Sequence, residues 1–237
     1  MLDKERNEDK LKVQFLELEG ENTLEEIEEK SRAFVKLITY YKCAIMEVET
    51  KFNVLNQEYS HDFDRNPINN IQSRIKRPQS IKEKMERNDF PRTIESIEQN
   101  LNDIAGVRVI CAFPEDVYTL AEAFLKQDDI TLITKKDYIA NPKKNGYRSL
   151  HLIVSIPIFL SQGRKEMKVE VQLRTIAMDF WASLEHQMRY KKDVCFTKEM
   201  ERELFECAEI SAALDSRMDR LRISANSKAV DKDILET

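Results

Sequence analysis

The sequence predicts a mixed α/β (α+β) protein in which helices flank one β-sheet and a long helix lies near each end of the chain. Two observations support this fold class. The 237 residues are 34% charged and include only 4 Gly and 6 Pro, which favours helices with solvated outer faces. Apolar residues recur every three, four or seven positions over roughly 23–58 and again over about 197–222, and alternating segments lie between them.

The bulk composition argues against several classes of protein. A net charge of −5 disfavours a general nucleic-acid binder, although a local basic cluster can still bind phosphates. The cysteines form no C-x-x-C pair, so we expect neither disulfides nor a zinc site, as in a reducing cytoplasm. The charged N-terminus indicates no signal peptide, and no apolar run approaches the ~20 residues of a membrane span. The cysteines are Cys43, Cys111, Cys195 and Cys207.

The two long helices bracket a single domain. Thr23 and Glu26 form a capping box, which predicts the start of the first helix. Each helix has an apolar stripe that must pack on the sheet or on another subunit. We expect a flexible N-terminal arm at 1–22, a domain at 23–222 with its centre at about 70–192, flanking helices at 23–58 and 197–222, and a frayed tail at 223–237.

The N-terminal arm is mostly charged but contains a short apolar patch. The patch consists of Val13, Phe15, Leu16 and Leu18. We therefore interpret residues 1–20 either as a loose arm or as a short docking segment.

The dipeptide His61-Asp62 invites comparison with metal-dependent HD phosphohydrolases. That chemistry needs several further His and Asp ligands, and the sequence has only two other histidines, His151 and His186. We interpret His61-Asp62 as an ordinary exposed dipeptide in the turn-rich stretch 60–68.

Residues 168–174 alternate strictly between polar and apolar side chains. This pattern predicts a strand with one face in the core, followed by a helix that starts at Thr175. Glu170, Gln172 and Arg174 then form a polar row on a rigid element. The row is either a solvated edge face or the floor of an active site with Glu170 as base or metal ligand.

A basic cluster lies between residues 74 and 87. Arg74 and Lys76 share one face of a predicted strand, and Pro78 then opens a helix. Lys84 lies one helical turn after Ser80. The cluster is either a solvated face or a cradle for a triphosphate, to which Lys brings point charge and Arg a planar fork.

Two further segments carry candidate site residues. Asp103 precedes a small-residue turn and the strand that contains Arg108, which is a natural place for a magnesium ligand, although a cap or turn residue is the alternative. The lysine-rich loop 135–147 ends at Asn145-Gly146-Tyr147, and His151 follows four residues later on the same strand face. This arrangement indicates either a base-stacking platform with phosphate clamps or a structural tyrosine.

Four separated pieces of the sequence resemble the synthetase domain of the RelA/SpoT family. They are SRIKRPQSIKEK, NDIAGVRVI, KKNGYRSLHL and VEVQLRTIAMDFWASLEH, and together they span about 70–192. The short chain, without a hydrolase domain or regulatory tail, is similar to the small alarmone synthetases. The segment IANPKKNGYRSLHL resembles the RelP-type branch more than the RelQ-type branch.

The resemblance implies a nucleotidyltransferase-like fold and a (p)ppGpp synthetase of the bacterial stringent response, acting with Mg²⁺ as a cytoplasmic homotetramer. The reaction moves the β,γ-pyrophosphate of ATP onto the ribose 3′-hydroxyl of GDP or GTP and leaves AMP. By the same resemblance, Asp103 and Glu170 hold the metal, and Glu170 also activates the 3′-hydroxyl. The implied ATP-binding residues are Arg74, Lys76, Ser80, Lys84 and Arg108. The implied residues of the GDP or GTP site are Lys143, Asn145, Tyr147, His151, Gln172 and Arg174.

Asp179 is a further candidate in the guanine site. A carboxylate can accept hydrogen bonds from both N1–H and the 2-amino group of guanine, a pair that adenine does not offer. We therefore predict that Asp179 helps to select guanine, with an exposed helix residue as the alternative.

Three other functions compete with the synthetase. A different nucleotidyltransferase would show a Gly-Ser pair followed by D-x-D on one strand, and the sequence has neither. A catalytically inactive module could bind nucleotides or single-stranded RNA through the basic cluster and Tyr147, but both acids, Asp103 and Glu170, are present. A helix-mediated scaffold leaves the four motifs without an explanation.

Overall fold

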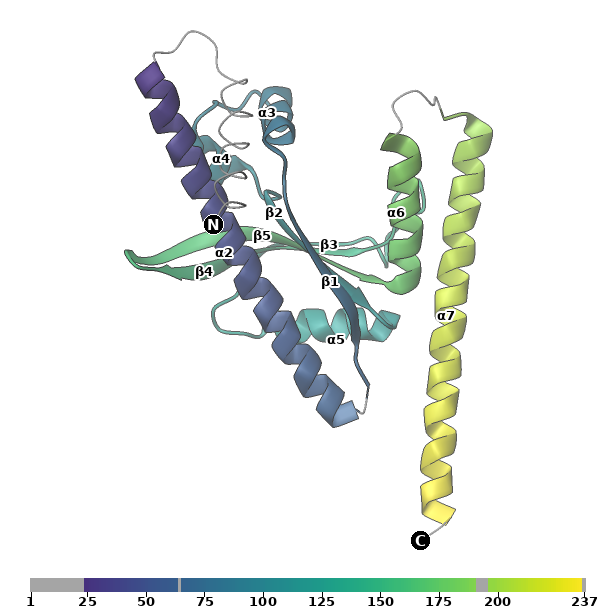
Figure 1. The fold of residues 1–237 in the computed structure, drawn as a ribbon. Helices are drawn as coiled ribbons and strands as arrows, with labels where there is room; N and C mark the ends of the chain where they lie inside the picture. The colour runs from purple at the N-terminus through teal and green to yellow at the C-terminus, as the bar shows by residue number, and fades with distance from the viewer. Residues whose placement is uncertain (1–23, 64, 191–195, 236–237) are drawn as a thin grey trace, which may run out of the picture.

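The structure is a computed structural model that describes residues 24–63, 65–190 and 196–235. The expected N-terminal arm at 1–22 lies outside the described residues. The centre is a five-stranded sheet in the order β1-β2-β5-β4-β3 (Figure 1). The β2–β5 pair is parallel and the other three pairs are antiparallel, which confirms the predicted mixed α/β class. The strands are β1 Ile68–Ile75, β2 Ala105–Cys111, β3 Thr131–Asp137, β4 Leu150–Leu160 and β5 Gly163–Thr175.

Two helices cover one face of the sheet. Helix α2, Leu24–Phe63, crosses the strands, and α5, Pro114–Leu125, lies beside it (Figure 1). Phe52 of α2 and Phe124 of α5 stack with their ring centroids 4.6 Å apart. The apolar side of β5 and the matching side chains of β4 are fully buried beneath them. Each such side chain contributes roughly 1.5–3 kcal/mol, so this face forms the core of the domain.

The other face of the sheet carries the polar side chains and lies between two groups of helices. Helix α3, Pro78–Arg87, follows β1 and is succeeded by α4, Ile94–Asn100, whereas α6, Ile176–Tyr190, continues directly from β5. The end of β1 pairs with the start of β2, and the end of β5 pairs with the end of β2. Helices α3 and α6 therefore begin at opposite ends of the polar face.

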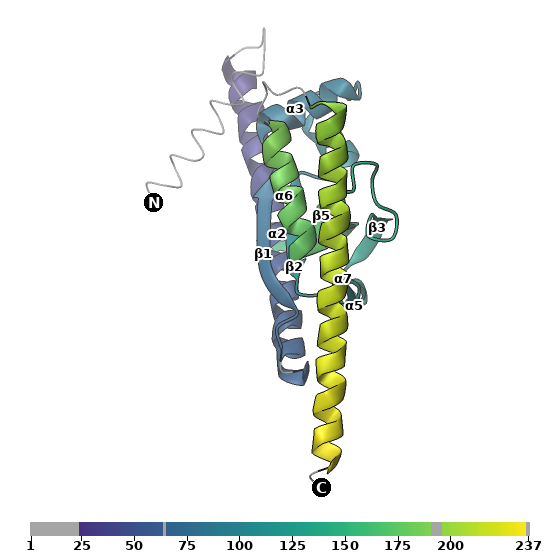
Figure 2. The ribbon, with the colours of Figure 1, turned by 90° about the vertical axis from the view of Figure 1, so that its right-hand side faces the viewer.

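Helix α7, Lys198–Leu235, runs alongside α6 and extends well beyond the sheet (Figure 2). The indole Nε1 of Trp181 donates to the Leu204 carbonyl across this pair at 2.9 Å. On another side of α7, large apolar residues are more than half exposed, among them Ile210, Leu214 and Leu221. Their spacing of four and seven places them in one row along the helix.

Both long helices extend further than the sequence predicted. Helix α2 continues to Phe63 rather than ending near residue 58, because Pro67 is the first breaker after it. The sequence predicted a helix over 197–222 and a frayed tail from residue 223, whereas α7 is helical as far as Leu235. No glycine or proline occurs between residues 198 and 235, so nothing in the local sequence ends the helix earlier. None of the helices in the described ranges is long and apolar enough to cross a bilayer.

Candidate active site

Four polar side chains form a row across the polar face of the sheet. The strand register sets each of them beside the next, although they come from four separate strands. In order across the sheet they are Gln72 of β1, Arg108 of β2, Gln172 of β5 and His151 of β4. A row built on paired strands is held by the ladder hydrogen bonds, so its spacing is rigid.

A second row across the same polar face has a glycine at its centre, and this leaves a hollow in the surface of the sheet. Here the register pairs Arg74 with Gly106, and Gly106 with Glu170. Because the glycine has no side chain, a hollow of about 250 Å³ opens above it, lined by both neighbours and by Arg108 and Gln172. The hollow therefore brings together guanidinium groups, an amide and a carboxylate.

Two lysines converge on the carboxylate of Asp103. Lys76 Nζ donates to Oδ2 at 2.8 Å, and Lys84 Nζ of α3 lies 2.9 Å from Oδ1. Burial raises the pKa of Asp103, but the hydrogen bond from Lys76 and the positive charges of both lysines outweigh it and hold the pKa below its usual value. Asp103 is therefore ionised at neutral pH, as the charge of its partners requires.

The start of α3 offers a second source of positive potential beside these lysines. Its N-cap residue, Arg77, makes no side-chain cap, and the first turn contains no acidic residue. The first N–H groups of a helix have no partner within the helix, and the helix dipole attracts anions there. Ser80 lies in this first turn and Lys84 one turn further on, so both lie near a suitable place for phosphate.

Glu170 belongs to a closed ring of five side chains. Gln172 Nε2 donates to its Oε2 at 3.0 Å, and His151 Nδ1 lies 3.4 Å from its Oε1. Arg174 Nη2 donates to Gln172 Oε1 at 2.9 Å and to the Tyr147 hydroxyl at 2.6 Å. The Tyr147 hydroxyl lies 2.8 Å from His151 Nε2, which closes the ring. Every member thus fixes the orientation of the next.

The ring also sets the charge state of Glu170. Burial raises its pKa, and so does the charge of Asp103. The hydrogen bonds from His151 and Gln172 and the charge of His151 more than compensate, so the pKa of Glu170 is lowered from its usual value. Glu170 is consequently an ionised, half-buried carboxylate at neutral pH, able to accept a proton or bind a cation.

Asp179 connects this ring to the arginine of β2. Its Oδ1 lies 3.1 Å from Arg174 Nη1 and 3.2 Å from Arg108 Nη1. Burial lowers the pKa of Arg108, and the neighbouring guanidinium groups of Arg174 and Arg74 lower it further, whereas Asp179 raises it. Asp179 is therefore a partly buried counter-ion for two arginines, not an exposed helix residue.

The loop before β4 forms an aromatic and basic cluster. Lys143 Nζ lies 4.6 Å from the ring centroid of Tyr138 and 4.8 Å from that of Tyr147. Asn145 Nδ2 donates to Glu185 of α6 at 3.3 Å, while its Oδ1 accepts from the Tyr147 backbone N–H at 3.3 Å. Lys143 therefore covers the aromatic rings, and the Asn145 amide is engaged within the protein.

Helix α7 supports this loop from behind. Gly146 adopts φ +87°, and a Cβ there would lie 2.5 Å from the Ala208 Cβ, so only glycine fits. Arg148 donates to the Gly146 carbonyl at 3.1 Å and to Glu209 of α7 at 2.9 Å. The position of Tyr147 thus depends on α7.

The same helix supports the junction between β5 and α6. The Thr175 hydroxyl donates to Asp215 Oδ2 at 2.6 Å and accepts from the Met178 N–H at 3.2 Å, which caps α6. Thr175 directly follows Arg174, and Asp179 lies in the first turn of α6. Asp215 therefore fixes the segment that carries two candidate site residues.

The structure brings most of the predicted site residues to one face. Within the described residues, the side chains of Arg74 and Ser80 make no hydrogen bond or ion pair. Only their positions, beside the hollow and in the first turn of α3, associate them with the candidate site. Sequence reasoning missed Tyr138, although an aromatic residue in a lysine-rich loop was a usable signal. It also missed Glu185 and Asp215, which lie 40 residues from their partners and carry no local signal.

The donor set of Asp103 and Glu170 fits a divalent cation. Asp103 Oδ1 is buried and accepts no hydrogen bond of good geometry from the described residues, even with Lys84 nearby. Carboxylate oxygens are the ligands that hard cations such as Mg²⁺ prefer. The described residues contain no cluster of three or more His, Cys, Asp or Glu side chains that could hold a metal, so water and substrate phosphates would complete the coordination.

Comparisons with known proteins agree on one family. A model described as the region found in RelA / SpoT proteins matches residues 73–194. GTP pyrophosphokinase YwaC of Bacillus subtilis is 43% identical over 178 residues, which cover 75% of this chain and 85% of that protein. GTP pyrophosphokinase YjbM of the same organism is 34% identical over 187 residues, or 79% and 87% of the two chains. YwaC is RelP-like, so the higher identity to YwaC than to YjbM confirms the predicted likeness to the RelP-type branch.

A solved structure gives the same result for the fold. The crystal structure of small alarmone synthetase 1 from Bacillus subtilis, bound to its product pppGpp, matches with a TM-score of 0.74 and 34% sequence identity. The match covers 81% of this chain and 97% of that one. At this identity the similarity extends beyond the fold to the sequence.

Proposed function

Because the chain belongs to the RelA/SpoT family, we propose that it is a small alarmone synthetase, a GTP pyrophosphokinase that transfers the β,γ-pyrophosphate of ATP to the 3′-hydroxyl of GDP or GTP. The observation that carries this proposal is the ionised Glu170 at the centre of the polar floor, with cations on one side and an aromatic loop on the other. Transfer of this kind needs positioning, charge neutralisation and one carboxylate near the nucleophile. The arrangement supplies all three.

The ATP side of the site is formed by β1, β2 and α3. Lys76, Lys84 and Ser80, together with the start of α3, would hold the phosphates, and the lysines would exchange part of their contact with Asp103 for phosphate oxygens. Arg74 and Arg108 would stack on the two faces of adenine, as planar guanidinium groups do. The bond between the β-phosphorus and the α,β-bridging oxygen breaks, and AMP leaves with that oxygen.

The acceptor side is formed by the loop before β4, by β5 and by α6. Tyr147 would stack on guanine once the flexible Lys143 side chain leaves its ring, and Lys143, Asn145 and His151 would then seat the phosphates and ribose. Glu170 accepts the proton of the 3′-hydroxyl while the 3′-oxygen of the acceptor forms its bond to the β-phosphorus. Gln172 and Arg174 keep Glu170 in place through the ring.

A divalent cation, Mg²⁺ in our proposal, would be held by Asp103 and Glu170 and would neutralise charge on the transferred pyrophosphate. We also propose that the protein assembles as a homotetramer through its terminal helices. The exposed apolar row on α7 supports this assembly, because such rows on a solvated surface usually mark an interface.

The experiment that tests the proposal is a chromatographic assay with ATP, Mg²⁺ and GDP, in which the chain is compared with Glu170→Gln. We expect equal amounts of AMP and a 3′-pyrophosphorylated guanine nucleotide, reduced by roughly 10²–10⁴-fold in the variant. Glu166→Gln is the matched control, because Glu166 lies on the same strand but is exposed and pairs with Arg164.

Each result of this assay has a distinct meaning. No AMP from the unaltered chain, with nucleotide binding still measurable, would favour an inactive binding module. Formation of AMP that Glu170→Gln leaves unchanged would mean that the reaction is right and the base is wrong.

A further inference from the structure

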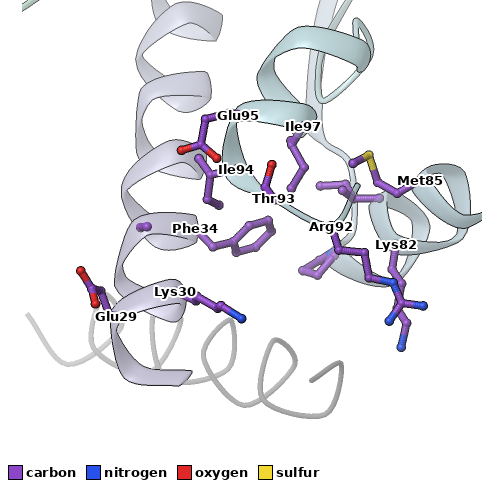
Figure 3. A pocket seen from close by; sticks show the side chains of 13 residues that line it. Glu29, Lys30, Phe34, Lys82, Met85, Arg92, Thr93, Ile94, Glu95 and Ile97 are labelled. Carbon is purple, nitrogen blue, oxygen red and sulfur yellow. The ribbon is translucent and has the colours of Figure 1, made fainter. Parts of the chain in front are cut away.

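A second cavity lies outside the candidate active site, between α2, α3 and α4 (Figure 3). Its volume of about 450 Å³ is in the range of ligand pockets. The lining is largely apolar, with Phe34 of α2, Ile81 and Met85 of α3 and Ile97 of α4 at its floor. None of the candidate catalytic residues lines it.

The rim of this cavity is positively charged on the side of α3. Lys82 is half-buried, and the Arg92 side chain is 60% exposed and pairs with Glu86 at 2.6 Å. In Figure 3 their nitrogen atoms lie at the same edge of the opening, whereas Glu29 and Glu95 lie away from it. An occupant with apolar side chains and flanking acids would match both the floor and this edge.

We propose that residues 11–18 of this same chain dock into the cavity. The segment contains Leu11 and the apolar patch of Val13, Phe15, Leu16 and Leu18, which the candidate active site does not use. The segment has one lysine, Lys12, near its start and one glutamate, Glu17, near its end, and Glu19 and Glu21 follow directly after it. The acidic residues therefore lie at and just beyond the C-terminal end of the segment, which is the part that can complement the basic edge.

The chain is long enough for this docking. Residues 18 and 24 are separated by six residues, which span up to about 20 Å when extended. The cavity meets α2 at Glu29 to Phe34, or about 7.5–15 Å along the helix from its start at Leu24. Gly20 lies within the connection and can adopt the backbone angles that a reversal of direction needs.

Docking in this place would brace α3 and α4 against α2. Ile81 and Met85 face the cavity, while Ser80 and Lys84 lie on a different side of the same helix. Burial of two or three apolar side chains from residues 11–18 would stabilise the docked arrangement by about 1.5 kcal/mol or more for each side chain. The segment would therefore stabilise the position of α3, the helix that carries Lys84, from the side that faces the cavity.

Disulfide trapping in the full-length chain tests the proposal directly. In a chain whose native cysteines are replaced, cysteine is placed in turn at Phe15, Leu16 or Leu18 and combined with Ile94→Cys in the cavity. Val54→Cys is the matched control, because Val54 is 59% exposed and lies on the same helix about 30 Å from the cavity. We expect an intrachain disulfide with position 94 for at least one arm position and none with position 54.

Two results of the trapping would overturn the proposal. Equal cross-linking to positions 94 and 54, or none to either, would mean that the segment does not dock in the cavity. Disulfides that join two chains would mean that the arm of a second copy is the occupant.

Hydrogen exchange of the otherwise unaltered chain provides an independent measurement. Leu16→Asp should make the amides of α4 and of the first turns of α2 exchange at least threefold faster, because a charge cannot enter the apolar floor. Leu2→Asp, an apolar-to-acidic change in the same arm outside the segment, should leave exchange unchanged. Equal effects of the two substitutions, or none from Leu16→Asp, would contradict docking.

Discussion

The two halves of the candidate site hold their side chains in different ways. On the acceptor side, Glu170, Gln172, Arg174, Tyr147 and His151 form a closed ring, and α7 supports the loop and the strand end behind it. On the donor side, two lysines share one carboxylate, and Arg74 and Ser80 have no polar side-chain partner within the described residues. Ordering side chains before the ligand arrives lowers the loss of entropy on binding. The proposed acceptor half is therefore preorganised, whereas the proposed donor half would have to rearrange around ATP.

The substitution expected to have the largest effect separates the two halves. Asp103→Asn should lower kcat/KM by at least roughly 100-fold, because it would remove a proposed metal ligand and would leave Lys76 and Lys84 without their counter-ion. The Kd for GDP, measured by calorimetry, should stay within about twofold, since the ring does not include Asp103. Glu83→Gln on α3 is the control and should change neither quantity. A GDP affinity that falls together with activity would mean that the halves are not independent.

The next prediction concerns Asp179, which contacts arginines of both halves. Asp179→Ala should reduce the preference for GDP over inosine diphosphate by at least about tenfold, because a hydrogen bond from the 2-amino group to a charged acceptor contributes about 1.5–3 kcal/mol. The KM for ATP should not change. The measurement is the ratio of kcat/KM for the two acceptors. An unchanged ratio would contradict a role in guanine selection and leave Asp179 as a counter-ion alone.

A smaller effect is expected when the ring is opened without loss of the stacking surface. Tyr147→Phe removes the hydroxyl that joins Arg174 to His151, so kcat/KM for GDP should fall about tenfold, or about 1.4 kcal/mol. The KM for ATP should be unaffected. Tyr138→Phe tests the specificity of this result, because the Tyr138 hydroxyl is not part of the ring. If both variants behave like the unaltered chain, the ring does not organise the acceptor half.

The smallest predicted effect concerns the support behind the acceptor half. Burial raises the pKa of Asp215, repulsion from Asp219 adds to this, and the hydrogen bond from Thr175 opposes it. A raised pKa means that the native state binds more protons than the unfolded state, whose Asp pKa is about 3.9. The contribution of Asp215 to stability is therefore present below pH ~3.9 and is lost as the pH rises through the native pKa.

Asp215→Asn keeps an acceptor for Thr175 without the buried charge. It should therefore raise Tm relative to the unaltered chain, and by more at pH 7 than at pH 4, in thermal unfolding followed by circular dichroism. Asp219→Asn removes a carboxylate that pairs with Arg222 at 2.8 Å and should instead lower Tm. A Tm for Asp215→Asn that is lower at pH 7 would show that the charge itself stabilises the junction.

The local pattern of the sequence was enough to predict the polar face of β5. Strict alternation placed Glu170, Gln172 and Arg174 on one strand face, and the structure has them there. The ring could not be predicted, because it closes only where β4 lies beside β5, and strand order is not a property of local sequence. The role of α7 was missed for the same reason, since Asp215 and Ala208 meet their partners only through tertiary packing.

Helix α7 packs against the candidate site with one side and exposes an apolar row on another, and this has a thermodynamic consequence. One side positions Gly146 and Thr175, while the other exposes the row of Ile210, Leu214 and Leu221. In the proposed homotetramer, a subunit that covers this row and favours one position of α7 would change the affinity for GDP by some factor. Linkage would then require GDP to change the affinity between subunits by the same factor. The concentrations of protein and acceptor would thus become two inputs to one equilibrium.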